Sequence, residues 1–184
     1  MRAVGRLSQA LAEGDGISIL VEVSDADAAG AAERQGADAL VSRHATLVVR
    51  EASQLPLLHL GNVREAGSAG ADAVVVASDA ATWDAVHAAD LEGVVRVGDP
   101  EDLERALEEI DPEILLLSTD LGSDGDPLES LLALLHDVPA GKLAIAELHD
   151  ATAEDVAELE RAGVDGVLVS GDVAALVGVE PPDV

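Results

Sequence analysis

Residues 142–170 read KLAIAELHDATAEDVAELERAGVDGVLVS, and this stretch contains one complete strand–helix–strand unit. Both ends are short apolar runs typical of buried strands. Between them, Thr152 and Asp155 have the spacing of a helix start, and Gly163 is typical of a helix end. Apolar strands joined by helices indicate a parallel sheet that is covered by helices.

The same unit repeats along the whole chain, at roughly twenty residues per repeat, which is near the minimum for a strand, a helix and two turns. Near-uniform spacing favours a closed (βα)8 barrel over a long doubly wound open sheet, whose two edges need protection. We therefore predict an α/β fold, one minimal (βα)8 TIM-barrel domain over residues 1–184 with a short helix at 2–13. The eight predicted strands cover residues 17–23, 37–43, 55–61, 71–78, 93–98, 113–118, 142–148 and 164–170.

Composition narrows the classes of function. The chain has 37 Asp or Glu against 10 Lys or Arg and a net charge of −27, so it would repel nucleic acid and anionic membranes. The absence of Cys excludes a disulfide framework and a cysteine nucleophile. We expect a cytoplasmic protein, because no apolar run could serve as a signal or span a membrane. We also expect a monomer without a cofactor.

The acidic residues are spread along the chain, and Lys142 is the only lysine. Such a surface is favoured in molar salt, where screening removes the self-repulsion of the charges. We expect a halophilic cytoplasm; the alternative is the ordinary acidic composition of a GC-rich genome.

Two stretches resemble a known family. VVRVGDPEDLERALEEIDPEILLLSTDL (94–121) and LAIAELHDATAEDVAELERAGVDGVLVSGDVAAL (143–176) resemble strands five to eight of indole-3-glycerol-phosphate synthase, a ribulose-phosphate-binding (βα)8 enzyme of tryptophan biosynthesis. The first half agrees more loosely through ILVEVS, RQGADALVS, LPLLHLG and SAGADAVVVA. An active member would be a carbon–carbon lyase.

The resemblance implies a site at the carboxyl ends of the strands, where several family residues are replaced. Glu22 and Glu147 match the family's first- and seventh-strand glutamates, and Arg96 stands where the fifth strand has a glutamate. The two lysine positions hold Ser24 and Leu60, the second being that of the general acid. Ring closure with decarboxylation and dehydration of an anionic substrate needs cationic groups, so we predict loss of this reaction.

The family's phosphate site lies after the last strand. Ser170 and Gly171 open the last helix at the place for an anion, whereas Asp172 would repel one and His149 replaces a glycine. The predicted ligand-binding residues are Arg43, His149, Ser170 and Gly171. The predicted catalytic residues are Glu22, Arg96 and Glu147.

Three interpretations of the barrel mouth stay open. The two glutamates and Arg43 and Arg96 could form a neutralised salt-bridge plug. Alternatively, the arginines grip a small carboxylate or phosphate and Glu147 acts as a base. The third is a metal site, with ligands among His44, His59, His149 and Glu22 or Asp120, although no ligand spacing is present and strand alternation points His59 toward the helices.

A nucleophilic triad is not expected, because Ser118, Thr119 and Ser170 have no evident histidine base in the sequence. Two functions therefore remain. The preferred one is a synthase-like barrel that has lost the reaction and binds a small anionic or phosphorylated ligand. The alternative is an active divergent synthase, or another phosphosugar lyase or isomerase that uses Glu147 and Arg96.

Overall fold

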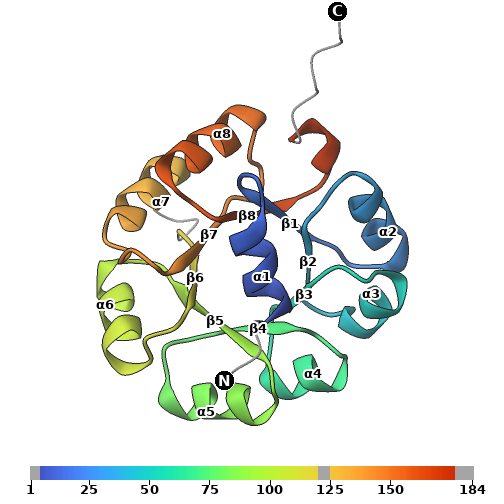
Figure 1. Cartoon of the computed structure of the whole chain (residues 1–184), viewed down its shortest axis with the longest axis horizontal. Coiled ribbons are helices and arrows are strands. Elements are labelled where there is room, and N and C mark those ends of the chain that lie inside the picture. Colours follow the sequence, from blue (N-terminus) through green and yellow to red (C-terminus); the bar gives the residue numbers. More distant parts are fainter. Residues whose placement is uncertain (1–4, 120–124, 177–184) are drawn as a thin grey trace, which may run out of the picture.

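The computed structural model describes residues 5–119 and 125–176, and its parallel strands close into a barrel surrounded by helices (Figure 1). The strands pair in chain order, and β8 pairs with β1 to complete the ring. This confirms the predicted α/β (βα)8 barrel. The strands are β1 (Ser18–Glu22), β2 (Ala39–Ser42), β3 (Leu57–His59), β4 (Ala73–Val76), β5 (Glu92–Val97), β6 (Ile114–Leu117), β7 (Leu143–Glu147) and β8 (Gly166–Ser170).

The outer layer consists of helices that alternate with the strands (Figure 1). Several helices have fewer than ten residues, which is how a short chain completes the ring. The helices after β1 to β7 are α2 (Ala26–Arg34), α3 (Thr46–Ala52), α4 (Val63–Ser68), α5 (Ala80–Ala88), α6 (Pro100–Glu109), α7 (Pro127–His136) and α8 (Ala153–Ala162), and the 3-10 helix η1 (Val173–Ala175) follows β8. Within the described ranges, no helix is long and apolar enough to cross a membrane.

The helix start predicted at Thr152 is confirmed. The Thr152 hydroxyl accepts the backbone N–H of Asp155 at 3.2 Å, and the Asp155 carboxylate accepts the backbone N–H of Thr152 at 2.8 Å. Gly163 ends α8 with a φ of 94°, a left-handed conformation that favours glycine.

Aspartates at the starts of three strands join each of these strands to its predecessor. The Asp165 carboxylate accepts the backbone N–H of Ala144 at 2.8 Å, and the Asp165 N–H donates to the Ala144 carbonyl oxygen at 2.9 Å. The same two bonds join Asp38 to Ile19 and Asp72 to Leu57. Each aspartate belongs to a Gly-Ala-Asp or Gly-Val-Asp sequence, so this repeated triplet ends a helix and sets the register of the next strand.

The helix α1 (Arg6–Glu13) lies across the amino-terminal end of the barrel, in the centre of the ring in Figure 1. Leu7 and Leu11 are buried in the same apolar cluster as the inward side chains of the strands. The Glu92 carboxylate at the start of β5 accepts the backbone N–H groups of Leu7 and Ser8 at 2.6 and 3.0 Å. An acid at this helix end also offsets the positive end of the helix dipole. Of the helix predicted at 2–13, residues 2–4 lie outside the described residues, and the helix observed at Arg6–Glu13 closes the bottom of the barrel.

Candidate functional site

The carboxyl ends of the strands carry charged side chains above an apolar barrel interior. Glu22 and Glu147 are the last residues of β1 and β7, and Arg96 is the penultimate residue of β5. Arg43 directly follows β2. Leu60, only 6% exposed, packs with the interior cluster at this end. The barrel therefore brings the predicted catalytic residues and Arg43 to one face, the face where (βα)8 enzymes hold their active sites.

Arg96 and Glu147 form the closer of two ion pairs at the mouth. The Arg96 Nη2 lies 3.1 Å from both carboxylate oxygens of Glu147, and the hydrogen bond is to Oε1. The Glu147 side chain is 8% exposed and that of Arg96 is 40% exposed. A buried carboxylate is costly unless it is paired, so Arg96 is the group that stabilises ionised Glu147.

Arg43 and Glu22 form the looser pair. The Arg43 Nε lies 3.5 Å from the Glu22 Oε1, and the Arg43 side chain is 46% exposed. An exposed ion pair of this length contributes little stability. Arg43 is therefore the guanidinium that can exchange its carboxylate for another anion at the lower cost.

His149 connects the ends of β7 and β8. Its Nε2 lies 3.1 Å from the Glu147 Oε1, and its Nδ1 lies 2.8 Å from the Ser170 Oγ. The Glu22 Oε2 is 3.8 Å from the same Nδ1. No histidine partner of Ser170 is evident in the sequence, and the structure places His149 within hydrogen-bond distance of it. The contact forms because β7 and β8 are neighbours, although the two residues lie 21 positions apart in the chain.

Two cavities open at the mouth, with volumes of about 520 and 620 Å³. Arg43, Arg96 and Ser118 line both of them. The smaller cavity also reaches Leu60, and the larger one reaches Glu147 and His149. Both guanidinium groups therefore face space that a small molecule can enter.

The segment after β8 differs from the predicted phosphate site. The Asp172 carboxylate accepts the backbone N–H of Ala174 at 3.0 Å, at the start of the three-residue helix η1. An anion at Ser170 and Gly171 would lie beside this carboxylate. Anion binding by Ser170 and Gly171 stays a prediction. The positively charged side chains of Arg43 and Arg96 attract an anion more strongly than this segment does.

The histidines do not gather into a metal site. His59 is buried among the helices, where its Nδ1 lies 2.7 Å from the Thr46 Oγ1 on α3, so it points away from the mouth as strand alternation predicted. In the part of the chain that the structure describes, no three His, Cys, Asp or Glu side chains are placed to hold a metal ion. Asp120, the other predicted oxygen ligand, lies outside the described residues.

His59 makes the stability of the barrel depend on pH. Burial lowers the pKa of His59 below its ordinary value of 6.5, although the nearby Glu65 carboxylate acts in the opposite direction. As the pH falls through this value, the unfolded chain binds a proton before the folded chain does, so this residue lowers the free energy of unfolding. We expect the wild type to lose more stability than His59→Gln between neutral and mildly acidic pH, measured by urea denaturation.

The wild type has to be compared with His59→Gln because protonation of the many carboxylates changes the free energy of unfolding of both proteins. His136→Gln, on α7, is the control and should follow the wild type. If His59→Gln and the wild type change in parallel, His59 does not carry this effect.

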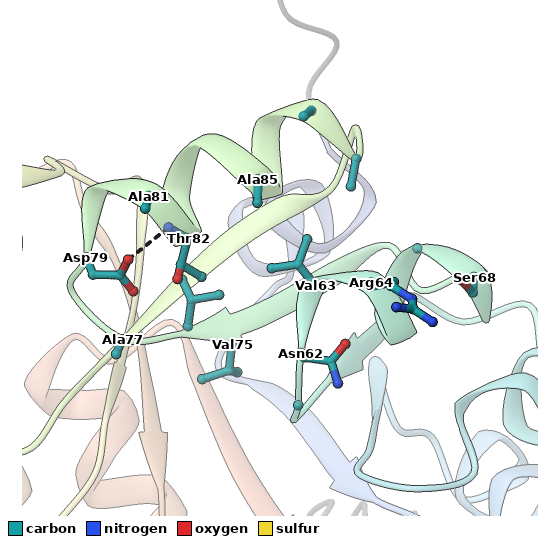
Figure 2. A pocket seen from close by; sticks show the side chains of 15 residues that line it. Asn62, Val63, Arg64, Ser68, Val75, Ala77, Asp79, Ala81, Thr82 and Ala85 are labelled. Carbon is teal, nitrogen blue, oxygen red and sulfur yellow. Dashed lines mark hydrogen bonds between the residues drawn. The ribbon is translucent and has the colours of Figure 1, made fainter.

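A cavity of about 1040 Å³ lies between α4 and α5 (Figure 2). It shares Gly61 and Ala77 with the smaller mouth cavity, but neither Arg43 nor Arg96 lines it. Small side chains such as Ala81 and Ala85 line it. Asp79 caps α5 at its edge by accepting the backbone N–H of Thr82 at 2.9 Å, and hydrogen bonds from Thr82 lower the pKa of Asp79. This carboxylate is thus used in the fold, and the mouth is the stronger candidate site.

A closed (βα)8 barrel with charged side chains at the carboxyl ends of its strands places the chain among the TIM-barrel proteins. No protein-family model matches the chain. It is 32% identical over 176 residues to the indole-3-glycerol phosphate synthase of Variovorax paradoxus (strain S110), covering 89% of this chain and 64% of that protein. It is 33% identical over 148 residues to the synthase of Acidithiobacillus ferrooxidans (strain ATCC 53993 / BNL-5-31), covering 73% of this chain and 54% of that protein. The chain is thus similar to indole-3-glycerol phosphate synthases and spans less than two thirds of the length of these relatives.

Solved structures agree on the fold. The N-acetylmannosamine-6-phosphate 2-epimerase of Clostridium perfringens superposes with a TM-score of 0.70 at 16% identity, covering 86% of this chain and 88% of that one. The thiamine phosphate pyrophosphorylase of Pyrococcus furiosus also has a TM-score of 0.70, at 18% identity, covering 87% and 93% of the two chains. At these identities the similarity concerns the barrel alone.

Proposed function

We propose that this synthase-like barrel has lost the ring-closing reaction and binds a small anionic or phosphorylated ligand at its mouth. The observation that carries the first part is Leu60, which stands at the position that the family resemblance assigns to the general-acid lysine. Its side chain is buried and apolar. It can neither hold the substrate carboxylate nor deliver a proton to a leaving oxygen.

The two arginines support anion binding. A guanidinium group offers paired N–H donors that match a carboxylate or a phosphate. Arg43 and Arg96 are both partly exposed and line the same two cavities. A ligand has to compete with Glu22 and Glu147 for them, and the net charge of −27 repels anions, so the proposal is for weak binding.

The ring-closing reaction is tested by supplying the synthase substrate and measuring indole-3-glycerol phosphate. We expect turnover at least about 1000-fold below that of the Variovorax paradoxus synthase in the same buffer, since loss of one such catalytic group commonly costs this much. Turnover within about a hundred-fold of that enzyme would contradict the proposal. It would favour the second candidate, an active divergent synthase or related phosphosugar lyase, which the sequence identity to the synthases supports.

Anion binding is tested by titrating inorganic phosphate and succinate at constant ionic strength, with chemical shifts or heat as the signal. We expect a weak, saturable response that is lost in Arg96→Ala. Arg161→Ala is the matched control, because it removes the same charge from an exposed position on α8. An unchanged response in Arg96→Ala, or no response in the wild type, would favour the salt-bridge plug.

A further inference from the structure

The ends of β7 and β8 hold three functional groups in one hydrogen-bonded chain. The parallel pairing of Glu147 with Leu168 brings both strand ends to the same edge of the barrel. The backbone N–H of Ser170 donates to the carbonyl oxygen of His149 at 3.0 Å, so the two backbones are fixed beside each other. The approach of the Glu147, His149 and Ser170 side chains therefore follows from strand register.

The hydrogen bonds define the tautomer of His149. An ionised carboxylate only accepts hydrogen bonds, so the Nε2 that lies 3.1 Å from Glu147 carries the hydrogen. The Nδ1 then holds a lone pair and accepts the hydroxyl hydrogen of Ser170 across 2.8 Å. This is the arrangement of a serine nucleophile, a histidine base and an orienting carboxylate, with the ring nitrogens in the opposite order to that of the serine proteases.

Two carboxylates lie close to the ring nitrogens of His149. Arg96 holds the Glu147 carboxylate in place, and the Glu22 carboxylate lies 3.8 Å from the Nδ1 of His149. The His149 ring therefore has one carboxylate near each of its two nitrogens.

The Ser170 side chain is accessible to solvent, and Gly171 follows it in the chain. Ser170 is exposed, and its partner His149 lines the cavity of about 620 Å³ together with Glu147. Gly171 has a φ of 95°, and a Cβ there would meet no atom of the described residues within 4 Å, so there is open space beside this residue in that part of the chain. In α/β-hydrolases the backbone N–H of the residue after the nucleophile binds the oxyanion, and Gly171 holds that position here.

We propose that Ser170, His149 and Glu147 form a hydrolytic triad for small acyl esters. The Ser170 Oγ attacks the ester carbonyl carbon while its proton passes to the Nδ1 of His149. The carbon–oxygen bond to the alcohol breaks, and His149 returns the proton to the leaving oxygen. A water molecule then attacks the acyl-serine in the same way, so one ester and one water become one acid and one alcohol.

The experiment uses p-nitrophenyl acetate, a neutral ester, and a fluorophosphonate that labels activated serines. We expect a burst of p-nitrophenol and a covalent adduct on Ser170, located by peptide mass spectrometry. Ser170→Ala removes both signals, and His149→Gln slows the burst and the labelling at least about 100-fold while Ser170 is still present. Glu147→Gln lowers the acylation rate, and Glu147→Asp restores part of it, because a carboxylate again selects the tautomer of His149.

Ser130→Ala and His136→Gln, both on α7, are the matched controls and should react like the wild type, because neither residue is among those that line the two mouth cavities. Circular dichroism establishes that each variant is folded. An unlabelled Ser170, adducts spread over other hydroxyls, or hydrolysis that persists in Ser170→Ala would overturn the triad. The probes carry no carboxylate or phosphate anion, so failure of the phosphate titration does not affect this test.

Discussion

Replacing Leu7 by alanine is expected to lower the free energy of unfolding by about 2–5 kcal/mol, the usual cost of truncating a buried leucine. The Leu7 side chain is 0% exposed and packs with the inward side chains of the strands at the bottom of the barrel. The helix α1 has eight residues, too few to be stable in water without this contact. The substitution therefore weakens both the packing and the closure of the barrel.

Urea denaturation followed by circular dichroism measures this loss. Leu47→Ala, on α3, is the matched control, because its side chain is 55% exposed and the same truncation should cost less than about 0.5 kcal/mol. Leu11→Ala should also destabilise the protein, and the double variant should show less than the sum of the two losses if the first one already detaches the helix. A loss of under about 1 kcal/mol for Leu7→Ala would mean that α1 does not hold the barrel closed.

The position of α1 illustrates what the sequence could not predict. Its amphipathic pattern shows that one face is buried, but the pattern does not show which part of the barrel covers that face. The strands were easier to predict, because a fully buried parallel strand is a short apolar run in the sequence itself. The predicted runs contain every strand except β5, which begins at Glu92, one residue earlier. Glu92 is polar because its carboxylate binds the amino-terminal end of α1.

In the candidate site, too, features that depend on neighbouring residues in the sequence could be predicted, and contacts between distant parts of the chain could not. The resemblance to the synthases placed Glu22, Arg96 and Glu147 at the mouth, because it could be followed residue by residue along each predicted strand. The contact between His149 and Ser170 depends on which strands are neighbours and on their register. A signal was nevertheless present: in a ring of eight strands the last two must pair, and both residues lie just at or after the ends of these strands. Adjacent strand ends are therefore a useful place to search for triads in barrel sequences.

Removing Arg96 is expected to destabilise the barrel, because it leaves the buried Glu147 carboxylate without its guanidinium. Breaking a fully buried pair costs about 3–5 kcal/mol, and the partial exposure of Arg96 reduces the expected loss for Arg96→Ala to about 1–3 kcal/mol. The combined replacement Arg96→Met and Glu147→Leu should have a stability close to or above that of the wild type, since no charge is then desolvated. Urea denaturation of the two variants and of Glu147→Leu measures these differences.

The combined variant also separates the two interpretations of the mouth. Arg105→Ala, which breaks the exposed pair with Asp102, is the control and should change the stability by less than about 1 kcal/mol. If the combined variant is as unstable as Arg96→Ala, the charges themselves hold the barrel together and the mouth is a structural plug. If the combined variant is stable but no longer binds phosphate and Ser170 is no longer acylated, apolar side chains can replace the ion pair in stabilising the barrel. The charges then serve the ligand and the chemistry at the mouth, where Arg96 binds the anion and Glu147 orients His149.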